Sequence, residues 1–183
     1  MYNSQMRLLP VVAFLLVPVA VAGESPTIMI AVSPPATRKL APDFALLDAA
    51  GRARSLGDYR GRVVVLDFWA TDCGGCRTEI PWFIDLAREY PKRRVAVVGV
   101  SMDILYEDLK SAGEAWARVR PFAEKMKMNY PILMGDDHVA SAYSIQALPQ
   151  TWLIDRQGRV AGTYVGLVNV ENLKSAIATL LAE

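Results

Sequence analysis

The feature that most constrains the fold is an apolar run that ends shortly before a pair of cysteines. Residues 62–69, Arg-Val-Val-Val-Leu-Asp-Phe-Trp, have the length of a strand and few polar side chains, which is typical of a strand covered on both faces. Cys73 and Cys76 follow, and apolar residues then recur at helical spacing over 78–90 until Pro91 ends the pattern. The sequence therefore predicts a buried strand, a dithiol and an amphipathic helix in direct succession.

The other apolar patterns predict an α/β fold with a mixed central sheet and helices on both faces. Residues 95–101 form a second buried strand, so strand, helix and strand make a right-handed parallel crossover. A short β-hairpin precedes it at 44–55, and a second hairpin is predicted at 151–165. Helices are expected over 107–128 with a break at Gly113, over 138–143 and over 170–181, with a short strand or extended link over 130–134.

The amino end has the pattern of a secretory signal peptide. Arg7 precedes an apolar segment, 8–22, that ends in the small residues a signal peptidase needs. We expect residues 1–22 to be removed and the protein to be periplasmic or otherwise extracytoplasmic. An uncleaved membrane anchor is the alternative, but the segment is shorter than the roughly 20 apolar residues that cross a bilayer, and it contains Pro10 and Pro18.

The composition limits the classes of protein to which this chain can belong. Residues 23–40 carry three prolines and no amphipathic period, so they are expected to form a flexible arm before one domain at 41–183. With 20 basic and 19 acidic side chains, the chain has no cationic excess for a nucleic acid, and none is expected as a partner. The 52% of hydrophobic residues excludes disorder, and two cysteines are too few for a disulfide-stapled miniature fold.

Cys73 and Cys76 are the residues best suited to chemistry. At a helix start, free amide groups and the helix dipole favour a thiolate, and the spacing lets the two sulfurs bond. Zinc is a competing interpretation, but it needs four ligands and His138, expected to be a surface or helix-start residue, is the only histidine. A purely structural bridge would close a very short loop and stabilise little. We predict a redox-active dithiol with no metal and no cofactor.

Two segments give the chain a resemblance to a known family. Residues 65–76, Val-Leu-Asp-Phe-Trp-Ala-Thr-Asp-Cys-Gly-Gly-Cys, resemble the active-site segment of thioredoxin-fold proteins. Residues 147–155, Ala-Leu-Pro-Gln-Thr-Trp-Leu-Ile-Asp, resemble their proline loop and the strand after it. Together with the leader and the segments at 41–44 and 55–61, they make the chain similar to exported thiol-disulfide oxidoreductases of the TlpA/ResA type. The resemblance covers residues 41–183 and implies a thioredoxin-like fold.

The resemblance implies roles for residues around the dithiol. Cys73 would be the exposed nucleophile that attacks a partner disulfide, and Cys76 the sheltered thiol that resolves the mixed disulfide. Pro149 would be a cis-proline opposite the dithiol, and Leu148 would offer backbone hydrogen bonds to the bound partner chain. Trp69 is expected to pack beside the dithiol, although a core aromatic would follow the same pattern.

Two acidic residues are candidates for proton transfer. Asp67 occupies the position of the buried acid of thioredoxin and is a candidate proton acceptor for Cys76; the alternative is a solvated strand residue. Glu79 matches the acid that TlpA/ResA-type proteins carry near the active site, and its helical spacing places it on the side of Cys76. The alternative for Glu79 is a solvated helix charge.

The chain departs from the common pattern at two positions. Gly75 replaces a frequent proline, and Asp72 replaces a frequent tryptophan. A carboxylate next to Cys73 opposes thiolate formation, which favours a reductant. We therefore expect a monomeric enzyme that reduces disulfides of protein partners and is re-reduced by a membrane electron donor. Cytochrome c maturation is one role that the family suggests.

Two other functions stay open at this point. A thiol peroxidase would consume peroxide at Cys73, but such a centre usually carries a threonine where this chain has Ala70. A non-enzymatic module that holds polypeptides beside Pro149 would keep its function after both cysteines are replaced by serine. An oxidoreductase is expected to lose its function completely in that variant.

Overall fold

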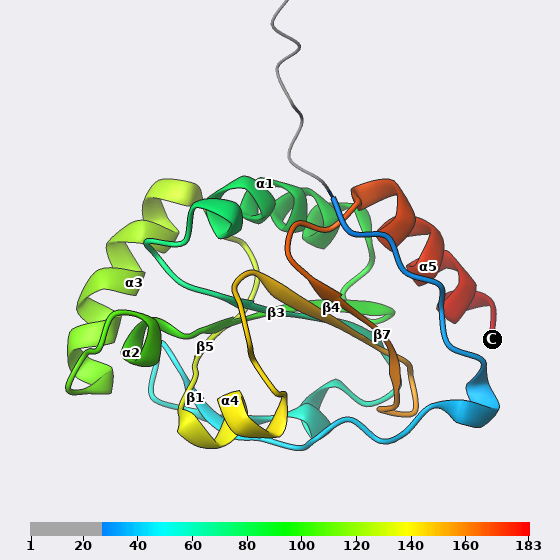
Figure 1. The fold of residues 1–183 in the computed structure, drawn as a ribbon, viewed down its shortest axis with the longest axis horizontal. Coiled ribbons are helices and arrows are strands. Elements are labelled where there is room, and N and C mark those ends of the chain that lie inside the picture. Colours follow the sequence, from blue (N-terminus) through cyan, green and yellow to red (C-terminus); the bar gives the residue numbers. More distant parts are fainter. Residues whose placement is uncertain (1–26) are drawn as a thin grey trace, which may run out of the picture.

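A seven-stranded mixed sheet in the order β2-β1-β5-β4-β3-β6-β7 forms the centre of the molecule (Figure 1). The structure, a computed structural model, describes residues 27–183, so the predicted signal peptide lies outside the described residues. Strands β3 and β4 are parallel, and β6 lies antiparallel to β3 on its other side. The strands are β1 (Ala45–Asp48), β2 (Ala53–Ser55), β3 (Val63–Trp69), β4 (Val95–Ser101), β5 (Ile132–Met134), β6 (Gln150–Ile154) and β7 (Val160–Val165).

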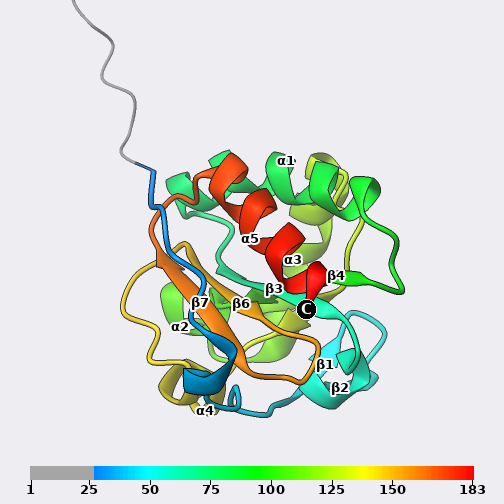
Figure 2. The same ribbon diagram turned by 90° about the vertical axis from the view of Figure 1, so that its right-hand side faces the viewer.

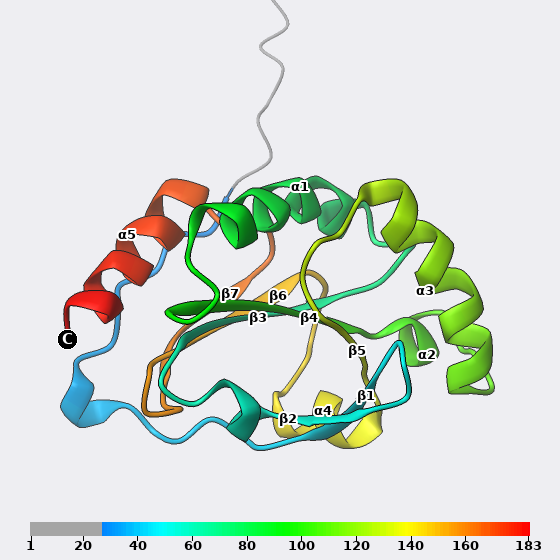
Figure 3. The same cartoon turned by 180° about the vertical axis from the view of Figure 1, so that it is seen from behind.

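Helices cover both faces of this sheet (Figures 1 and 3). Helices α1, α3 and α5 pack on one face, and α4 with the 3-10 helix η2 packs on the other. The predicted α/β fold, with an initial hairpin, is confirmed. No helix within residues 27–183 is long and apolar enough to span a membrane. The helices are η1 (Pro35–Thr37), η2 (Leu56–Tyr59), α1 (Gly74–Glu89), α2 (Asp103–Tyr106), α3 (Ala112–Met126), α4 (Asp137–Ala142) and α5 (Val170–Ala182).

Strand β3 explains the unbroken apolar run of the sequence. All of its residues are buried, because it lies between β4 and β6 and carries helices on both sides. Its odd-numbered apolar residues pack in the layer of α1 and α5, and its even-numbered ones pack in the layer of α4. Asp67 is odd-numbered, so this alternation directs its side chain toward α1. The only acid of the strand therefore lies in the layer that also holds the cysteines.

The first part of the helix predicted over 107–128 is wrong, because residues 107–111 are not helical and α2 ends before them at Tyr106. Residues 107–111 separate the two helices, whereas Gly113 lies in the first turn of α3. Ser111 begins the new helix, because its hydroxyl accepts a hydrogen bond from the N–H of Glu114 at 3.2 Å. A serine cap followed three residues later by a glutamate is a start signal that outweighs the glycine.

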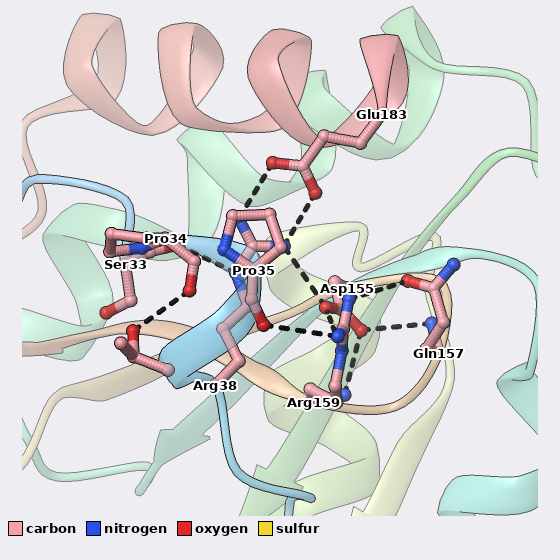
Figure 4. Close-up of polar contacts among 9 residues, drawn as sticks. Ser33, Pro34, Pro35, Arg38, Asp155, Gln157, Arg159 and Glu183 are labelled. Carbon is pink, nitrogen blue, oxygen red and sulfur yellow. Dashed lines mark hydrogen bonds and ion pairs between the residues drawn. The ribbon is translucent and has the colours of Figure 1, made fainter.

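The arm predicted at 23–40 is docked on the domain in its described part. Residues 27–32 run along β7 and the start of α5 (Figure 2). Further on, Arg38 is buried and its guanidinium Nη1 lies 3.1 Å from Asp155 and 2.6 Å from the carboxylate of Glu183 (Figure 4). The prolines suggested a tether, but partly buried apolar residues and one buried arginine fix the segment to both the sheet and the last helix.

Candidate active site

Cys73 and Cys76 form a disulfide in the first turn of α1, with the sulfurs 2.10 Å and the Cα atoms 5.3 Å apart. Cys73 is the N-cap, since its sulfur accepts a hydrogen bond from the N–H of Cys76 at 3.2 Å. The cap starts α1 at Gly74 rather than at the predicted Thr78. Cys73 is 3% exposed and Cys76 1%. The expectation of an exposed Cys73 is therefore not met in the oxidised form, because the bond folds both sulfurs into the helix turn.

The proline loop lies directly against the CxxC motif. The Leu148–Pro149 peptide bond is cis, as the resemblance implied. A Cβ on Gly75 would lie 2.9 Å from Cδ of Pro149 and 3.6 Å from Cδ2 of Leu167. The glycine thus leaves room for the two loops that face the dithiol, which gives a physical reason for its departure from the common proline.

Asp67 from β3 and Glu79 from α1 bring two carboxyl groups into the layer between the sheet and α1. They are 1% and 0% exposed, so the solvated alternatives for both residues are excluded. One oxygen of Glu79 accepts a hydrogen bond from the backbone N–H of Val168, in the loop between β7 and α5. Oδ1 of Asp67 and Oε2 of Glu79 have no hydrogen-bond partner among the described residues. The active site therefore holds two buried acids with unused hydrogen-bonding capacity.

Burial raises the pKa of both carboxyl groups, because the charged form loses its hydration. Loss of hydration raises the pKa of Asp67 well above its ordinary value, and the nearby charge of Glu79 raises it further. For Glu79, burial outweighs the hydrogen bond from Val168 and raises the pKa to about 7. Glu79 can therefore take up and release a proton near neutral pH, which is the range a proton acceptor for a thiol requires.

Two residues of this layer escaped the sequence analysis. The hydroxyl of Thr151, which pairs with Asp67 across β6 and β3, has no partner among residues 27–183, and neither has the hydroxyl of Tyr130. Burial raises the pKa of Tyr130 well above its ordinary value, and the charges of Asp67 and Glu79 raise it further, which places the phenol near both acids. No local motif marks Tyr130, because it reaches the acids only through the packing of distant segments.

Trp69 and Leu148, which the sequence predicts around the dithiol, both pack against the hydrophobic core. Trp69 is fully buried in the cluster that contains both cysteines, and its ring stacks on Phe122 of α3 with centroids 5.5 Å apart. Leu148 is partly buried and packs against the clusters on both sides of the sheet. His138 is exposed in the first turn of α4, in the other layer, as expected for a surface residue.

The carboxylate of Asp72, next to Cys73, is neutralised by two arginines. Its oxygens lie 2.7 Å from Arg77 of α1 and 2.7 Å from Arg118 of α3. Arg118 also lies 3.2 Å from Glu107. The expected effect of Asp72 on the Cys73 thiolate requires an unpaired negative charge. Because both arginines pair with this carboxylate, Asp72 by itself gives little support to a reducing direction. The ion pairs instead tie α3 to the loop that carries the dithiol.

Comparison with known families agrees with this arrangement. The model of the AhpC/TSA family matches residues 37–163, more than half of the chain. The chain belongs to this family. It is 36% identical over 141 residues to the thiol-disulfide oxidoreductase ResA of Geobacillus thermodenitrificans. The match covers 76% of this chain and 75% of that protein. It is 32% identical over 137 residues to the thioredoxin-like protein YneN of Bacillus subtilis, covering 75% of this chain and 76% of the relative.

A solved structure shares the fold of this AhpC/TSA member. The crystal structure of a protein from Chlorobium tepidum, described as a DsbE thiol:disulfide interchange protein, superposes with a TM-score of 0.67 and 29% identity. The match covers 79% of this chain and 96% of that one. The predicted thioredoxin-like fold, the membership of the ResA-type thiol-disulfide oxidoreductases and the prediction of a redox enzyme are thereby confirmed.

Proposed function

We propose that this protein is an extracytoplasmic reductase of protein disulfides that uses the dithiol of Cys73 and Cys76. The observation that carries the proposal is a disulfide at a helix start, one helical turn from a buried carboxyl group with a pKa near 7. The cis-proline loop beside it supports a role in holding the partner chain. The site thus combines a nucleophile, a proton acceptor and a binding surface.

The reaction follows two exchanges of sulfur bonds. The thiolate of reduced Cys73, favoured by the free amide groups and dipole of α1, attacks one sulfur of the partner disulfide and expels the other as a thiolate, which takes up a proton. Cys76 then attacks Cys73, re-forms the disulfide and releases the second partner thiol. Two electrons pass from the dithiol to the partner.

Cys76 needs a proton acceptor because it is sheltered from water in the oxidised form. Glu79 lies one turn along α1 and carries an oxygen without a hydrogen-bond partner in the described part of the chain. We assign Glu79 as the acceptor of the Cys76 proton and Asp67 as the second acid that shares this proton. Strong disulfide oxidants have a stabilised reduced form, whereas two acids in this layer oppose thiolates, so a reducing direction is favoured.

The partner is proposed to be a polypeptide with an apolar segment beside its disulfide. A groove of about 240 Å³ adjoins the proline loop and is lined mainly by apolar side chains of α2, of the end of α4 and of the loop before β6. Leu105 and Tyr106 on its rim are 38% and 53% exposed. Leu148 lies at the junction of this groove and Pro149, which supports its assignment to partner binding.

The cellular setting completes the proposal. Residues 1–22 would direct export, residues 41–183 would form the working domain, and a membrane electron donor would re-reduce the disulfide. Cytochrome c maturation is a role of this kind. The protein is proposed to act as a monomer without a metal or cofactor, and its reductant would reach the same dithiol as its substrate.

The reduction potential of the purified mature protein in glutathione and dithiothreitol buffers tests the direction. A reductant gives a potential below that of glutathione, below about −220 mV, and a value near about −120 mV contradicts the proposal. Insulin reduction and peroxide consumption, measured on wild type and on Cys73→Ser, separate a disulfide reductase from a thiol peroxidase. Polypeptide binding that survives replacement of both cysteines, without any exchange activity in wild type, would identify a binding module.

A further inference from the structure

Residues 27–32 form an extended segment, here named the strap, between the edge strand β7 and helix α5 (Figures 1 and 2). Ile28, Ile30 and Val32 are partly buried against the core, and the residues between them are exposed. This alternation is that of a strand with one face on the protein. The strap therefore uses side chains at every second position to hold the outer edge of the sheet.

The strap is hydrogen-bonded to the loop that contacts Glu79. The N–H of Ile28 donates to the carbonyl of Leu167 at 2.6 Å, and the N–H of Asn169 donates to the carbonyl of Ile28 at 2.9 Å. These two bonds form a parallel bridge between Ile28 and Val168. Val168 is the residue whose N–H donates to the carboxylate of Glu79. Ile28 of the strap thus bonds both neighbours of Val168, whose N–H is the backbone donor to the candidate proton acceptor among the described residues.

Two further contacts fix the position of the strap on the domain. The side chain of Asn172 accepts a hydrogen bond from the N–H of Ile30 and donates one to its carbonyl, each at 3.0 Å. A Cβ on Gly162 would lie 2.1 Å from Cδ1 of Ile30. The Ile30 side chain thus packs directly over Gly162 in the outer strand of the sheet.

From this geometry we infer that the strap is a positioning element of the active site, which keeps the Val168 amide on the Glu79 carboxylate and so tunes the proton acceptor. The inference rests on the proposed role of Glu79. A hydrogen bond to a carboxylate stabilises its charged form, so a loosened loop raises the pKa of Glu79 above its value of about 7. A leader removed after Ala22 leaves the strap in the mature protein.

The other groups that face Glu79 do not supply this stabilisation. Asp67 on β3 and Tyr130 ahead of β5 face it with groups that are neutral or negative. Cys76, on its own helix, is bonded and does not ionise in the oxidised form. The loop between β7 and α5 contributes the Val168 amide. The Val168 amide is therefore the neighbour that lowers the pKa of Glu79, against the larger and opposite effect of burial.

Two proline variants of the mature oxidised protein test the inference. Ile28→Pro removes the N–H that bonds Leu167. Met29→Pro is the matched control, because Met29 is 68% exposed and its N–H makes no hydrogen bond among the described residues. The measurement is the carboxyl ¹³C titration of Glu79 by NMR, together with hydrogen exchange of the Val168 amide. We expect Ile28→Pro to move the Glu79 midpoint up by about one pH unit and to speed the exchange, and Met29→Pro to change neither.

A second variant keeps the test decisive if Ile28→Pro does not fold. Ile30→Ala retains the backbone bonds and removes only the side chain seated on Gly162, so a smaller upward shift in the Glu79 midpoint is expected. A Glu79 midpoint equal to that of wild type in the strap variants that fold overturns the inference. The titration needs no substrate. A protein that shows the shift but reduces no disulfide would refute the proposed function and leave the role of the strap intact.

Discussion

Two of the buried carboxylate sites in residues 27–183 have opposite environments. Asp155, in the turn between β6 and β7, pairs with Arg38 at 3.1 Å and Arg159 at 2.8 Å and accepts backbone hydrogen bonds (Figure 4). Burial alone would raise the pKa of Asp155, but these donors outweigh it and hold the pKa below its ordinary value. Asp67 and Glu79 have no such cation, and the pKa of each is raised.

The difference separates a structural site from a chemical one. Arg38 shows that this fold can bring a cation to a buried acid from a segment more than a hundred residues away. Around the dithiol, the described residues instead leave carboxyl oxygens unpaired, which costs stability. Such a cost is expected where a group must exchange protons, since a fully paired carboxylate no longer does so near neutral pH.

The largest expected effect comes from breaking the paired site. Arg38→Ala leaves Asp155 without one buried partner and frees Glu183, so the free energy of unfolding at pH 7 is expected to fall by about 3 to 5 kcal/mol. Urea denaturation of the oxidised protein measures this change. Arg88→Ala is the control, because Arg88 pairs with Asp85 on the exposed surface of α1 and is expected to change stability little. A loss below about 1 kcal/mol for Arg38→Ala would remove the contrast between the two sites.

The pH dependence of stability should have opposite signs at the two sites. The raised pKa of Glu79 means that the folded state holds a proton which the unfolded state releases, so wild type loses stability as the pH rises from about 4 to about 7. Glu79→Gln removes this loss, and its advantage over wild type should grow to about 3 kcal/mol over that range. The lowered pKa of Asp155 stabilises the fold above the unfolded pKa and is lost in acid, so Asp155→Asn should be weakest at pH 7 and approach wild type below pH 4.

Denaturation curves of both oxidised variants between about pH 2 and pH 8 give this comparison directly. Parallel pH profiles for Glu79→Gln and Asp155→Asn would show that the two carboxyl groups have similar environments, contrary to the structure. Since both substitutions replace an acid by its amide, differences of side-chain size cannot account for profiles that diverge.

A rate effect is expected at Asp67. Burial and the nearby charge of Glu79 raise the pKa of Asp67 well above its ordinary value, and Asp67→Asn keeps the size of the side chain while removing the group that exchanges a proton. We expect stability to be retained and the resolution of the mixed disulfide by Cys76 to slow by about 10- to 100-fold. Stopped-flow reduction of a model protein disulfide measures this rate. Asp155→Asn serves as the comparison, and equal rates in the two variants would exclude Asp67 from the proton path.

The elements that sequence analysis predicted well have patterns local to themselves. The strands predicted at 95–101 and, within the second hairpin, at 160–165 agree with the structure at both ends, because continuous or alternating apolar residues mark a strand without knowledge of its neighbours. Cys73 and Cys76 were found in the same way, from spacing and position after a strand. The roles of Asp67 and Glu79 came from the resemblance, since one acid in an apolar run does not by itself specify what it contacts.

The features that were missed depend on partners far away in the chain. The strap lies between Pro26 and Pro34 in the sequence and lacks regular secondary structure, and Ile30 bonds to Asn172, 142 residues later. Gly162 lies under the side chain of Ile30, but the sequence does not reveal this contact, because the two residues are far apart in the chain. The pairing of Asp72 with Arg118 is likewise long-range, and without it the carboxylate next to Cys73 was taken as uncompensated.

The smallest expected effect concerns Asp72, a carboxylate that is paired but exposed. Asp72→Asn frees Arg77 and Arg118, so a small rise in the thiolate fraction of reduced Cys73 is expected. The side chain of Asp72 is 53% exposed, so solvent and salt screen the change. Thiolate absorbance against pH, at low salt and at 1 M salt, measures it. Asp85→Asn, farther along α1, is the control and should have no effect. A rise in the thiolate fraction that persists in 1 M salt would mean that Asp72 acts on Cys73 through the structure of the loop. Exposed and buried acids of this site would then differ less than their burial indicates.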